Sequence, residues 1–194
     1  VHYFAAGATM FGSDAQGGYE YSGKTYAGLF AHTGGFDSCL GCHDAHELEP
    51  KAEACSGCHA TDEFEAIRMT SVADYDGDGD AAEGLKAEIE GMKEALYTAL
   101  QAYAADTIGT AVIYDSHAYP YFFNDSNGNG AIDPGEAIYP NAYSTWSPRL
   151  LRAAYNFQYA SKDPGGYVHN FAYVGQLLYD SIDDLGAAGG MTRP

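Results

Sequence analysis

Residues 39–59 read CLGCHDAHELEPKAEACSGCH, and they hold all four cysteines of the chain in two C-x-x-C-H motifs. The members of the two motifs are Cys39, Cys42 and His43, then Cys55, Cys58 and His59. This spacing is typical of c-type haem attachment, in which two thiols bond to the vinyl groups of one haem and the next imidazole binds its iron. The motifs therefore predict two covalently bound haems, with His43 and His59 as their proximal ligands.

Other uses of a C-x-x-C pair are a redox-active dithiol and half of a zinc site. A histidine directly after both pairs favours haem over these alternatives and over a framework of disulfides. Because the motifs use every cysteine, no disulfide can brace the fold, and we expect the haems to do so.

The composition indicates a folded and strongly acidic protein. Of its 194 residues, 46% are hydrophobic and 14% aromatic, which is enough for one sizeable domain. The 17 tyrosines suit an aromatic-rich core, or surfaces that pack against haem or another subunit. Nine basic against 27 acidic residues give a net charge of -18. This balance excludes nucleic acid as a partner, because phosphate binding needs clustered lysine or arginine.

No apolar run reaches the roughly 18 residues of a membrane-spanning helix. No signal peptide is visible at Val1. Since haem is attached to c-type cytochromes outside the cytoplasm, we expect that a precursor carried an export signal and that Val1 is a processed or trimmed start. The expected location is extracellular or at the cell surface, with the periplasm as second choice.

The pattern of residues changes near position 70. Residues 1–70 hold the cysteines, five of the seven histidines and little helical periodicity, as expected of a loop-rich region that wraps haem. Residues 71–194 contain the helical patterns and two calcium-type loops. The sequence thus predicts a mainly α fold, in which a dihaem-binding region precedes about three helices with little β structure, all in one compact unit.

Three helices and one short strand are predicted. The first helix runs over about 85–105, on an apolar stripe at steps of three and four residues formed by Leu85, Ile89, Met92, Leu96, Leu100 and Tyr103. Ser147-Pro148 suits the N-cap and first turn of a second helix, which continues to about residue 160. A third helix is expected over 167–185, and a short strand over 111–114.

Residues 125–136 match the twelve-residue calcium loop of an EF-hand at every position. The predicted ligands are the carbonyl of Ala131 and the side chains of Asp125, Asn127, Asn129, Asp133 and Glu136. Because strong flanking helices are missing, we expect an isolated structural calcium loop rather than a paired sensor. A solvated Asn-Gly turn is the alternative.

A second acidic loop begins in the same way. Its candidate calcium ligands are Asp74, Asp76, Asp78 and Asp80. The twelfth position is Leu85, so Glu83, Glu88 or water would have to complete the shell. The alternative is a charged run that precedes a helix. We expect both calcium ions to be structural, since each would close a loop at a helix boundary and offset carboxylate repulsion.

Five further histidines could supply the sixth ligands of the two irons. His46 and His169 are preferred together, followed by His32, then His2 and last His117. Met10 and Met69 are the competing methionine ligands. His46 follows the first motif closely, and His169 stands at the expected start of the third helix, where packing could hold its ring. We predict bis-His ligation of both haems and leave open which histidine serves which haem.

Further stretches carry a resemblance, namely 2–9 (HYFAAGAT), 39–59, 74–80 (DYDGDGD), 117–123 (HAYPYFF) and 163–170 (DPGGYVHN). Together they resemble the surface multihaem c-type cytochromes of metal-respiring bacteria, and the similarity extends over nearly the whole chain. The resemblance implies extracellular or periplasmic electron transfer through bis-His haems, and some related cytochromes polymerise into haem-lined filaments. His2 would then serve a haem of this chain, of a neighbouring subunit or of a further N-terminal portion.

The predicted function is electron transfer by a dihaem c-type cytochrome that is not an enzyme. The expected partners are other copies of the chain, in a filament, and redox proteins or extracellular acceptors. The main alternative is a dihaem peroxidase or small-molecule reductase with one five-coordinate haem, which the surplus of histidines disfavours.

Overall fold

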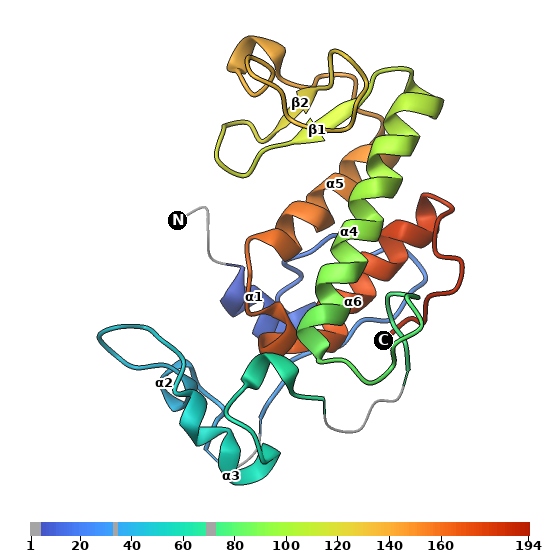
Figure 1. The fold of residues 1–194 in the computed structure, drawn as a ribbon. Helices are drawn as coiled ribbons and strands as arrows, with labels where there is room; N and C mark the ends of the chain where they lie inside the picture. Colours follow the sequence, from blue (N-terminus) through green and yellow to red (C-terminus); the bar gives the residue numbers. More distant parts are fainter. Residues whose placement is uncertain (1–4, 33–34, 69–72) are drawn as a thin grey trace.

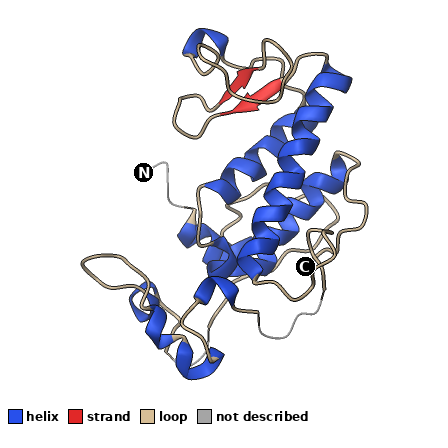
Figure 2. Cartoon of the chain, in the orientation of Figure 1, coloured by secondary structure: helices blue, strands red, loops and turns tan. Residues whose placement is uncertain are grey.

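Three long helices form the centre of the fold. The computed structural model describes residues 5–32, 35–68 and 73–194, and Figure 1 shows α4, α5 and α6 side by side within it. Their bounds are Leu85–Tyr103, Pro148–Ser161 and Gly166–Asp184. The predicted mainly α fold with little β structure is confirmed (Figure 2). Among the described helices, none combines the length and the apolar character needed to cross a membrane.

The three predicted helices are confirmed, with small changes at their ends. Ser147 caps α5 as expected, because its hydroxyl accepts a hydrogen bond from Leu150 N at 3.2 Å. Pro148 occupies the first turn, where its missing N–H costs nothing. α4 continues into one turn of π-helix, η4 (Ala104–Ile108).

Short helices surround this centre, and apolar periodicity does not predict them because each is only one or two turns long. They are α1 (Ala6–Phe11), η1 (Gly12–Asp14), α2 (Cys39–Cys42), η2 (Ala52–Ala54), α3 (Ser56–His59), η3 (Phe64–Ala66) and η5 (Tyr139–Asn141).

A two-stranded antiparallel sheet lies at one end of the helices. The strands are β1 (Val112–Tyr114), which confirms the predicted strand, and β2 (Phe122–Asn124), with Val112 opposite Asn124. β2 is not predicted, because its 3 residues, Phe-Phe-Asn, show neither alternation nor an apolar run like that of residues 111–114. Figure 1 shows this sheet at the upper end of the molecule and α2 and α3 at the lower end.

A continuous apolar core holds the three helices together. Its fully buried side chains include Met92 and Leu96 from α4, Leu150 from α5, and Leu178 and Ile182 from α6. Fully burying one such side chain stabilises a fold by about 1.5–3 kcal/mol. The apolar stripe in the sequence therefore predicts the buried face of α4 correctly.

The N-terminal arm, residues 5–30, packs along α5 and α6. Asn156 of α5 is fully buried, accepts from Tyr19 N at 2.7 Å and donates to the Tyr19 carbonyl at 3.0 Å. The hydroxyl of Tyr173, on α6, accepts from Gly18 N at 3.1 Å. Much of the predicted haem region is therefore tied to the helices, and the division of the chain at residue 70 stays a prediction.

α6 bends directly after His169. Asn170 has a φ of -169° and a ψ of 82°, so the first turn of α6 is separate from the rest of the helix. Its Oδ1 accepts from Tyr173 N at 3.1 Å, and its Nδ2 donates to the Gly28 carbonyl at 2.9 Å. His169 thus belongs to a short turn that is held by the N-terminal arm and by the longer part of α6.

Candidate haem-binding site

The haem segment, residues 35–68, carries both C-x-x-C-H motifs, and each motif forms one turn of helix, α2 or α3. In each motif the N–H of the histidine donates to the carbonyl of the first cysteine, at 2.8 Å in the first and 2.9 Å in the second. Residues three apart on a helical turn lie on the same face, so both thiols of a motif can bond to one haem. All four cysteines are free, and Cys39 and Cys58 are exposed.

A hairpin formed by residues 44–50 brings the second motif back beside the first. Lys51 N donates to the Cys42 carbonyl at 2.8 Å, and Lys51 Nζ donates to the Leu40 carbonyl at 2.9 Å. Burial raises the pKa of the Cys42 thiol, and the neighbouring Cys55 thiol adds to the rise. The hydrogen bonds of Lys51 therefore hold the start of the second motif next to the first.

The first motif lies against a histidine from the helices. The ring centroids of His43 and His169 are 6.3 Å apart, with 40° between the ring planes. His43 Nδ1 lies 2.8 Å from the Leu48 carbonyl oxygen. His169 Nδ1 lies 2.8 and 2.9 Å from the two carboxylate oxygens of Asp163. Since these contacts place the ring proton on Nδ1, Nε2 of each ring is the nitrogen that can bind a metal.

The second motif lies against a histidine that precedes the first motif. The ring centroids of His59 and His32 are 6.0 Å apart, with 50° between the ring planes. The His32 ring also packs edge-on against Phe30 at 6.4 Å and Phe36 at 5.9 Å. His59 Nδ1 is buried and has no hydrogen-bond partner among the described residues. Each proximal histidine thus has one candidate distal histidine beside it.

The spacing of both histidine pairs suits an iron between the rings. An imidazole nitrogen binds a metal at about 2 Å, and the ring centre lies about 1 Å behind it, so two rings on opposite sides of one metal have centres about 6 Å apart. The observed spacings are 6.3 and 6.0 Å. With two thiols next to each proximal histidine, the residues fit a covalent haem that has two axial imidazoles.

The other predicted ligands do not join these pairs in the described structure. His46 lies at the exposed tip of the hairpin, and no contact between its ring and a proximal histidine is found in the described part of the chain. His117 lies between β1 and β2, and its side chain is 92% exposed. Met10 lies on α1. His2 and Met69 lie outside the described residues.

Asp163 and Gly165 support the His169 ring, and the sequence predicts a role for neither. Asp163 is 4% exposed. A Cβ at Gly165 would lie 2.7 Å from Cε1 of His169, so only glycine leaves room for the ring. The signal for this site is the stretch DPGG, residues 163–166, which leads from the end of α5 into the first residue of α6, three residues before His169.

Residues 125–136 form a loop closed by side chain to backbone hydrogen bonds. The carboxylate of Asp125 accepts from two backbone N–H groups, each at 2.7 Å, and that of Glu136 accepts from two more, at 2.8 and 3.0 Å. The side-chain amides at the third and fifth positions donate to Asp133, at 2.6 and 2.8 Å. The predicted side-chain ligands therefore gather in one loop, and the calcium ion itself stays a prediction.

The acidic loop before α4 is closed in a similar way. The Asp74 carboxylate accepts from two glycine N–H groups, at 2.6 and 2.8 Å. Asp76, Asp78 and Asp80 each accept from the backbone N–H two residues later, at 3.1, 2.7 and 2.9 Å. Oxygens of Asp74, Asp76 and Asp78 lie within 4.8 Å of one another, and Asp80 is not part of that group.

Glu83 and Glu88 bring further carboxylates to this loop. They are the predicted substitutes for the ligand that an EF-hand loop has at its twelfth position, where this chain has Leu85. Their oxygens and that of Asp76 lie within 4.8 Å of one another. Burial, together with the neighbouring carboxylates of Asp76 and Asp78, raises the pKa of Glu83 to about 7. Glu83 Oε1 is buried and has no hydrogen-bond partner within the described ranges. Glu83 is therefore the carboxylate of this group that a cation would stabilise most.

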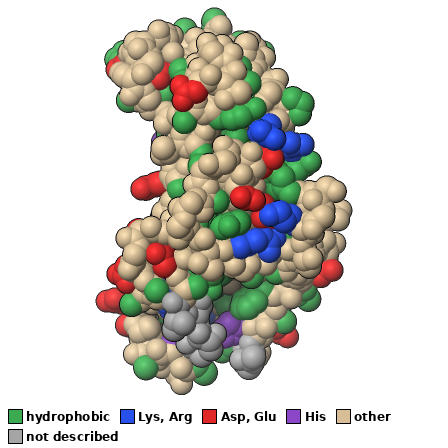
Figure 3. All heavy atoms as spheres, turned by 90° about the vertical axis from the view of Figure 1, so that its right-hand side faces the viewer, with side chains coloured by type: hydrophobic (Ala, Val, Ile, Leu, Met, Phe, Trp, Pro, Cys, Tyr) green, Lys and Arg blue, Asp and Glu red, His purple; other side chains and the backbone are tan. Residues whose placement is uncertain are grey.

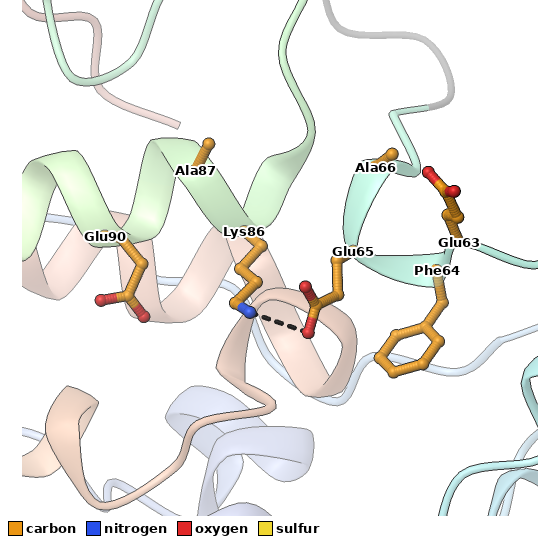
Figure 4. Close-up of a pocket in the computed structure, with 7 residues that line it drawn as sticks. All are labelled: Glu63, Phe64, Glu65, Ala66, Lys86, Ala87 and Glu90. Carbon is orange, nitrogen blue, oxygen red and sulfur yellow. Dashed lines mark ion pairs between the residues drawn. The ribbon is translucent and has the colours of Figure 1, made fainter.

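An open pocket of about 600 Å³ lies where the haem segment meets α4 (Figure 4). Its lining residues are Glu63, Phe64, Glu65, Ala66, Lys86, Ala87 and Glu90. Lys86 Nζ lies 2.7 Å from Glu65 Oε1, so an ion pair joins the haem segment to the first turn of α4. The lining includes no cysteine or histidine, which separates this pocket from the histidine pairs.

Comparison with known proteins finds relatives of one class. The chain is 34% identical to the C-type polyheme cytochrome OmcB of two strains of Geobacter sulfurreducens, and 33% identical to the C-type polyheme cytochrome OmcC of that species. Each match covers 94% of this chain but only 26% or 25% of the relative, so the chain spans about one quarter of their length. No family model and no solved structure matches. The similarity supports a c-type cytochrome, with covalent haem at its C-x-x-C-H motifs, as the class of this chain.

Proposed function

We propose that this chain transfers electrons through two bis-His haems. The proposed ligands are Cys39, Cys42, His43 and His169 for the first haem and Cys55, Cys58, His59 and His32 for the second. The observation that carries the proposal is the spacing of the two histidine pairs, 6.3 and 6.0 Å, at the two C-x-x-C-H motifs. The similarity to polyhaem c-type cytochromes supports it.

The chain contributes the position and the ligands of each haem. A bound haem supplies a reversible one-electron change at its iron. Two axial imidazoles suit this role, because the ligands need not change between the oxidation states. The hairpin of residues 44–50 keeps the two attachment sites together. Cys39 and Cys58 are exposed, and histidine reaches the surface at this end of the molecule (Figure 3), so a redox partner could approach closely.

The holoprotein is expected to hold two haems per chain, both low-spin, and to bind almost no carbon monoxide after reduction. Six-coordinate iron offers no vacant position to that ligand. Mass spectrometry counts the haems, and absorption spectroscopy during a carbon monoxide titration reports the coordination. Binding of one equivalent would instead favour the alternative, a dihaem peroxidase or small-molecule reductase with one five-coordinate haem. One haem per chain would contradict both the proposed electron carrier and the dihaem enzyme.

We also propose that calcium binds the two acidic loops as a structural ion. Asp125 and Glu136 of the loop at residues 125–136 are buried, at 9% and 6% exposure. The loop before α4 adds Glu83 and Glu88 to its aspartates. Such clusters of carboxylate and amide oxygens match the ligands that calcium prefers. In a chain with a net charge of -18, a bound cation would also reduce carboxylate repulsion.

Removal of calcium is expected to lower the melting temperature without changing the haem spectra. A ligand that binds only the native state stabilises it by about 2.7 kcal/mol at one hundred times its Kd. Glu136→Gln should reproduce part of this loss, whereas Asp106→Asn, at an exposed position outside both loops, should not. Melting curves with calcium and with a chelator measure the effect. Equal melting temperatures, with no calcium found by metal analysis, would show that neither loop binds calcium.

The proposed partners are other copies of the chain, and redox proteins or acceptors at or outside the cell surface. Large apolar side chains are exposed at both ends of the molecule, with Leu40 at 59% and Leu48 at 69% on the haem segment, and Tyr119 at 71% and Tyr139 at 69% near the β strands. The two tyrosine rings are stacked, 6.2 Å apart. A contact between unlike ends that does not close on itself produces a filament.

Self-association is expected in native material at physiological salt with calcium present. Tyr139→Ser should reduce the size of the assemblies, because it removes apolar area from one end of the molecule. Leu151→Ser is the matched control, since Leu151 is 51% exposed on α5 and belongs to neither group of exposed side chains. Light scattering measures the mass. A single species near the 20.7 kDa of the polypeptide plus two haems would reject assembly.

A further inference from the structure

We propose that Asp163 tunes the first haem, because its carboxylate holds a negative charge against the axial ligand His169 and so lowers the reduction potential of that haem. The inference rests on the proposed ligation by His169. It gives Asp163 the role of a positioning residue, which acts on the iron through the histidine.

The carboxylate of Asp163 is built into the turn that carries His169. Its side chain is 2% exposed, and both of its oxygens lie within 2.9 Å of His169 Nδ1, at 2.8 and 2.9 Å. Oδ1 also accepts from Gly165 N at 3.2 Å, which fixes the carboxylate relative to the backbone. Because the group is removed from water, its charge acts on the ring with little screening.

The ring has little freedom to leave this carboxylate. A Cβ at Gly165 would lie 2.7 Å from Cε1 and 3.1 Å from Nδ1 of His169, so the ring lies directly over the glycine. Asn170 ties the next residue of the chain to the N-terminal arm through Gly28. The hydrogen bond from Nδ1 to Asp163 is therefore a fixed feature of the site rather than one of several side-chain arrangements.

Nδ1 of each proximal histidine has different surroundings. His43 Nδ1 lies against the Leu48 carbonyl, a neutral acceptor. His59 Nδ1 has no hydrogen-bond partner in the part of the chain that the structure describes. Hydrogen bonds to an ionised acceptor are roughly twice as strong as those to a neutral one. Of His43, His59 and His169, only His169 has a carboxylate at this position.

A carboxylate that accepts the Nδ1 proton makes the imidazole a more basic ligand. Ferric iron carries one more positive charge than ferrous iron, so the more basic ligand stabilises the ferric state more. Addition of one electron to the first haem is then less favourable, while the proton stays on Nδ1 in both oxidation states. The expected result is a lower reduction potential for the haem that His43 and His169 bind.

Three variants of the holoprotein test this role by redox titration, with electron paramagnetic resonance of the oxidised protein to record the spin states. Asp163→Asn keeps an oxygen for the Nδ1 proton and removes the charge. Asp163→Glu keeps the charge and serves as the conservative variant. Asp180→Asn is the matched control, because the Asp180 side chain is also buried, at 0% exposure, but lies eleven residues after His169, in the part of α6 beyond the bend.

In Asp163→Asn, one of the two midpoint potentials should rise by the equivalent of about a tenfold change in the equilibrium constant, about 59 mV for one electron. The second midpoint should stay, and Asp163→Glu and Asp180→Asn should leave both near their wild-type values. Two unchanged midpoints in Asp163→Asn with both haems low-spin would overturn the tuning role and leave the proposed ligation intact. A high-spin haem in this variant would also overturn it, since Asp163 would then only hold the ring. A high-spin haem in the wild type would contradict the proposed function itself.

Discussion

Replacement of His169 by alanine is expected to turn one of the two haems from low to high spin, while both haems stay covalently attached. The ring of His169 is the one that lies beside His43, 6.3 Å from it, so its loss leaves the sixth position of the first haem empty. In the proposed ligation, the thioether bonds involve only the cysteines, and the second haem has its own pair, His59 and His32. About half of the low-spin signal should therefore disappear.

Absorption and electron paramagnetic resonance spectra of the oxidised holoprotein measure this change. The reduced variant should bind one equivalent of carbon monoxide. His117→Ala is the control, since this side chain is 92% exposed and lies near the β strands. His46→Ala should leave the spectra unchanged as well. Unchanged spectra in His169→Ala would remove His169 from the ligands, and a new high-spin haem in His46→Ala would restore His46.

Replacement of Glu88 by alanine is expected to destabilise the fold by about 3–5 kcal/mol, because it breaks a buried ion pair from one side. Glu88 is fully buried on α4, and its Oε1 lies 2.5 Å from Arg68 Nη1. The Arg68 side chain is itself only 7% exposed. Its Oε2 accepts from the backbone N–H groups of Tyr75 and Asp76, at 2.8 and 3.1 Å. The substitution deprives one buried charge and two loop N–H groups of their shared acceptor.

For a domain of this size, the expected loss corresponds to a fall in melting temperature of roughly 6–20 °C. Chemical denaturation in the presence of a chelator separates this loss from any effect on calcium. Glu90→Ala is the matched control, because Glu90 lies on the same helix but is 47% exposed in its pair with Lys93. Such a surface pair contributes about 0–1 kcal/mol. A similar small change in Glu88→Ala would show that the carboxylate does not support the loop.

Features that depend on neighbouring residues could be predicted from the sequence. The stripe that begins at Leu85 defines the buried face of α4, and Ser147-Pro148 sets the start of α5, because both patterns are local. The predicted attachment residues rest on the same kind of local pattern, the C-x-x-C-H spacing. The turn that each motif forms is short, but its residues are adjacent in the chain, so its chemistry can be predicted without the fold.

Features that depend on contacts between residues far apart in the chain could not be predicted from the sequence. The sequence identifies both His46 and His169 as candidates, but it does not show that, of these two, the fold brings only the His169 ring beside His43. The bend at Asn170 depends on Gly28, far away in the N-terminal arm. The carboxylate of Asp163 became visible as part of the site only once the position of the His169 ring was known.

The pairing of His43 with His169 has a consequence for how the opening of this molecule could be observed. An iron between these rings would join the haem segment to α6, in addition to the ion pair of Lys86 with Glu65 that joins it to α4. Separation of the two parts would break the iron–imidazole bond, while the thioethers keep the haem on its segment. The colour of the protein would then change at the moment of separation. Stopped-flow absorption could follow this docking and undocking with the haem as a built-in probe and no added label.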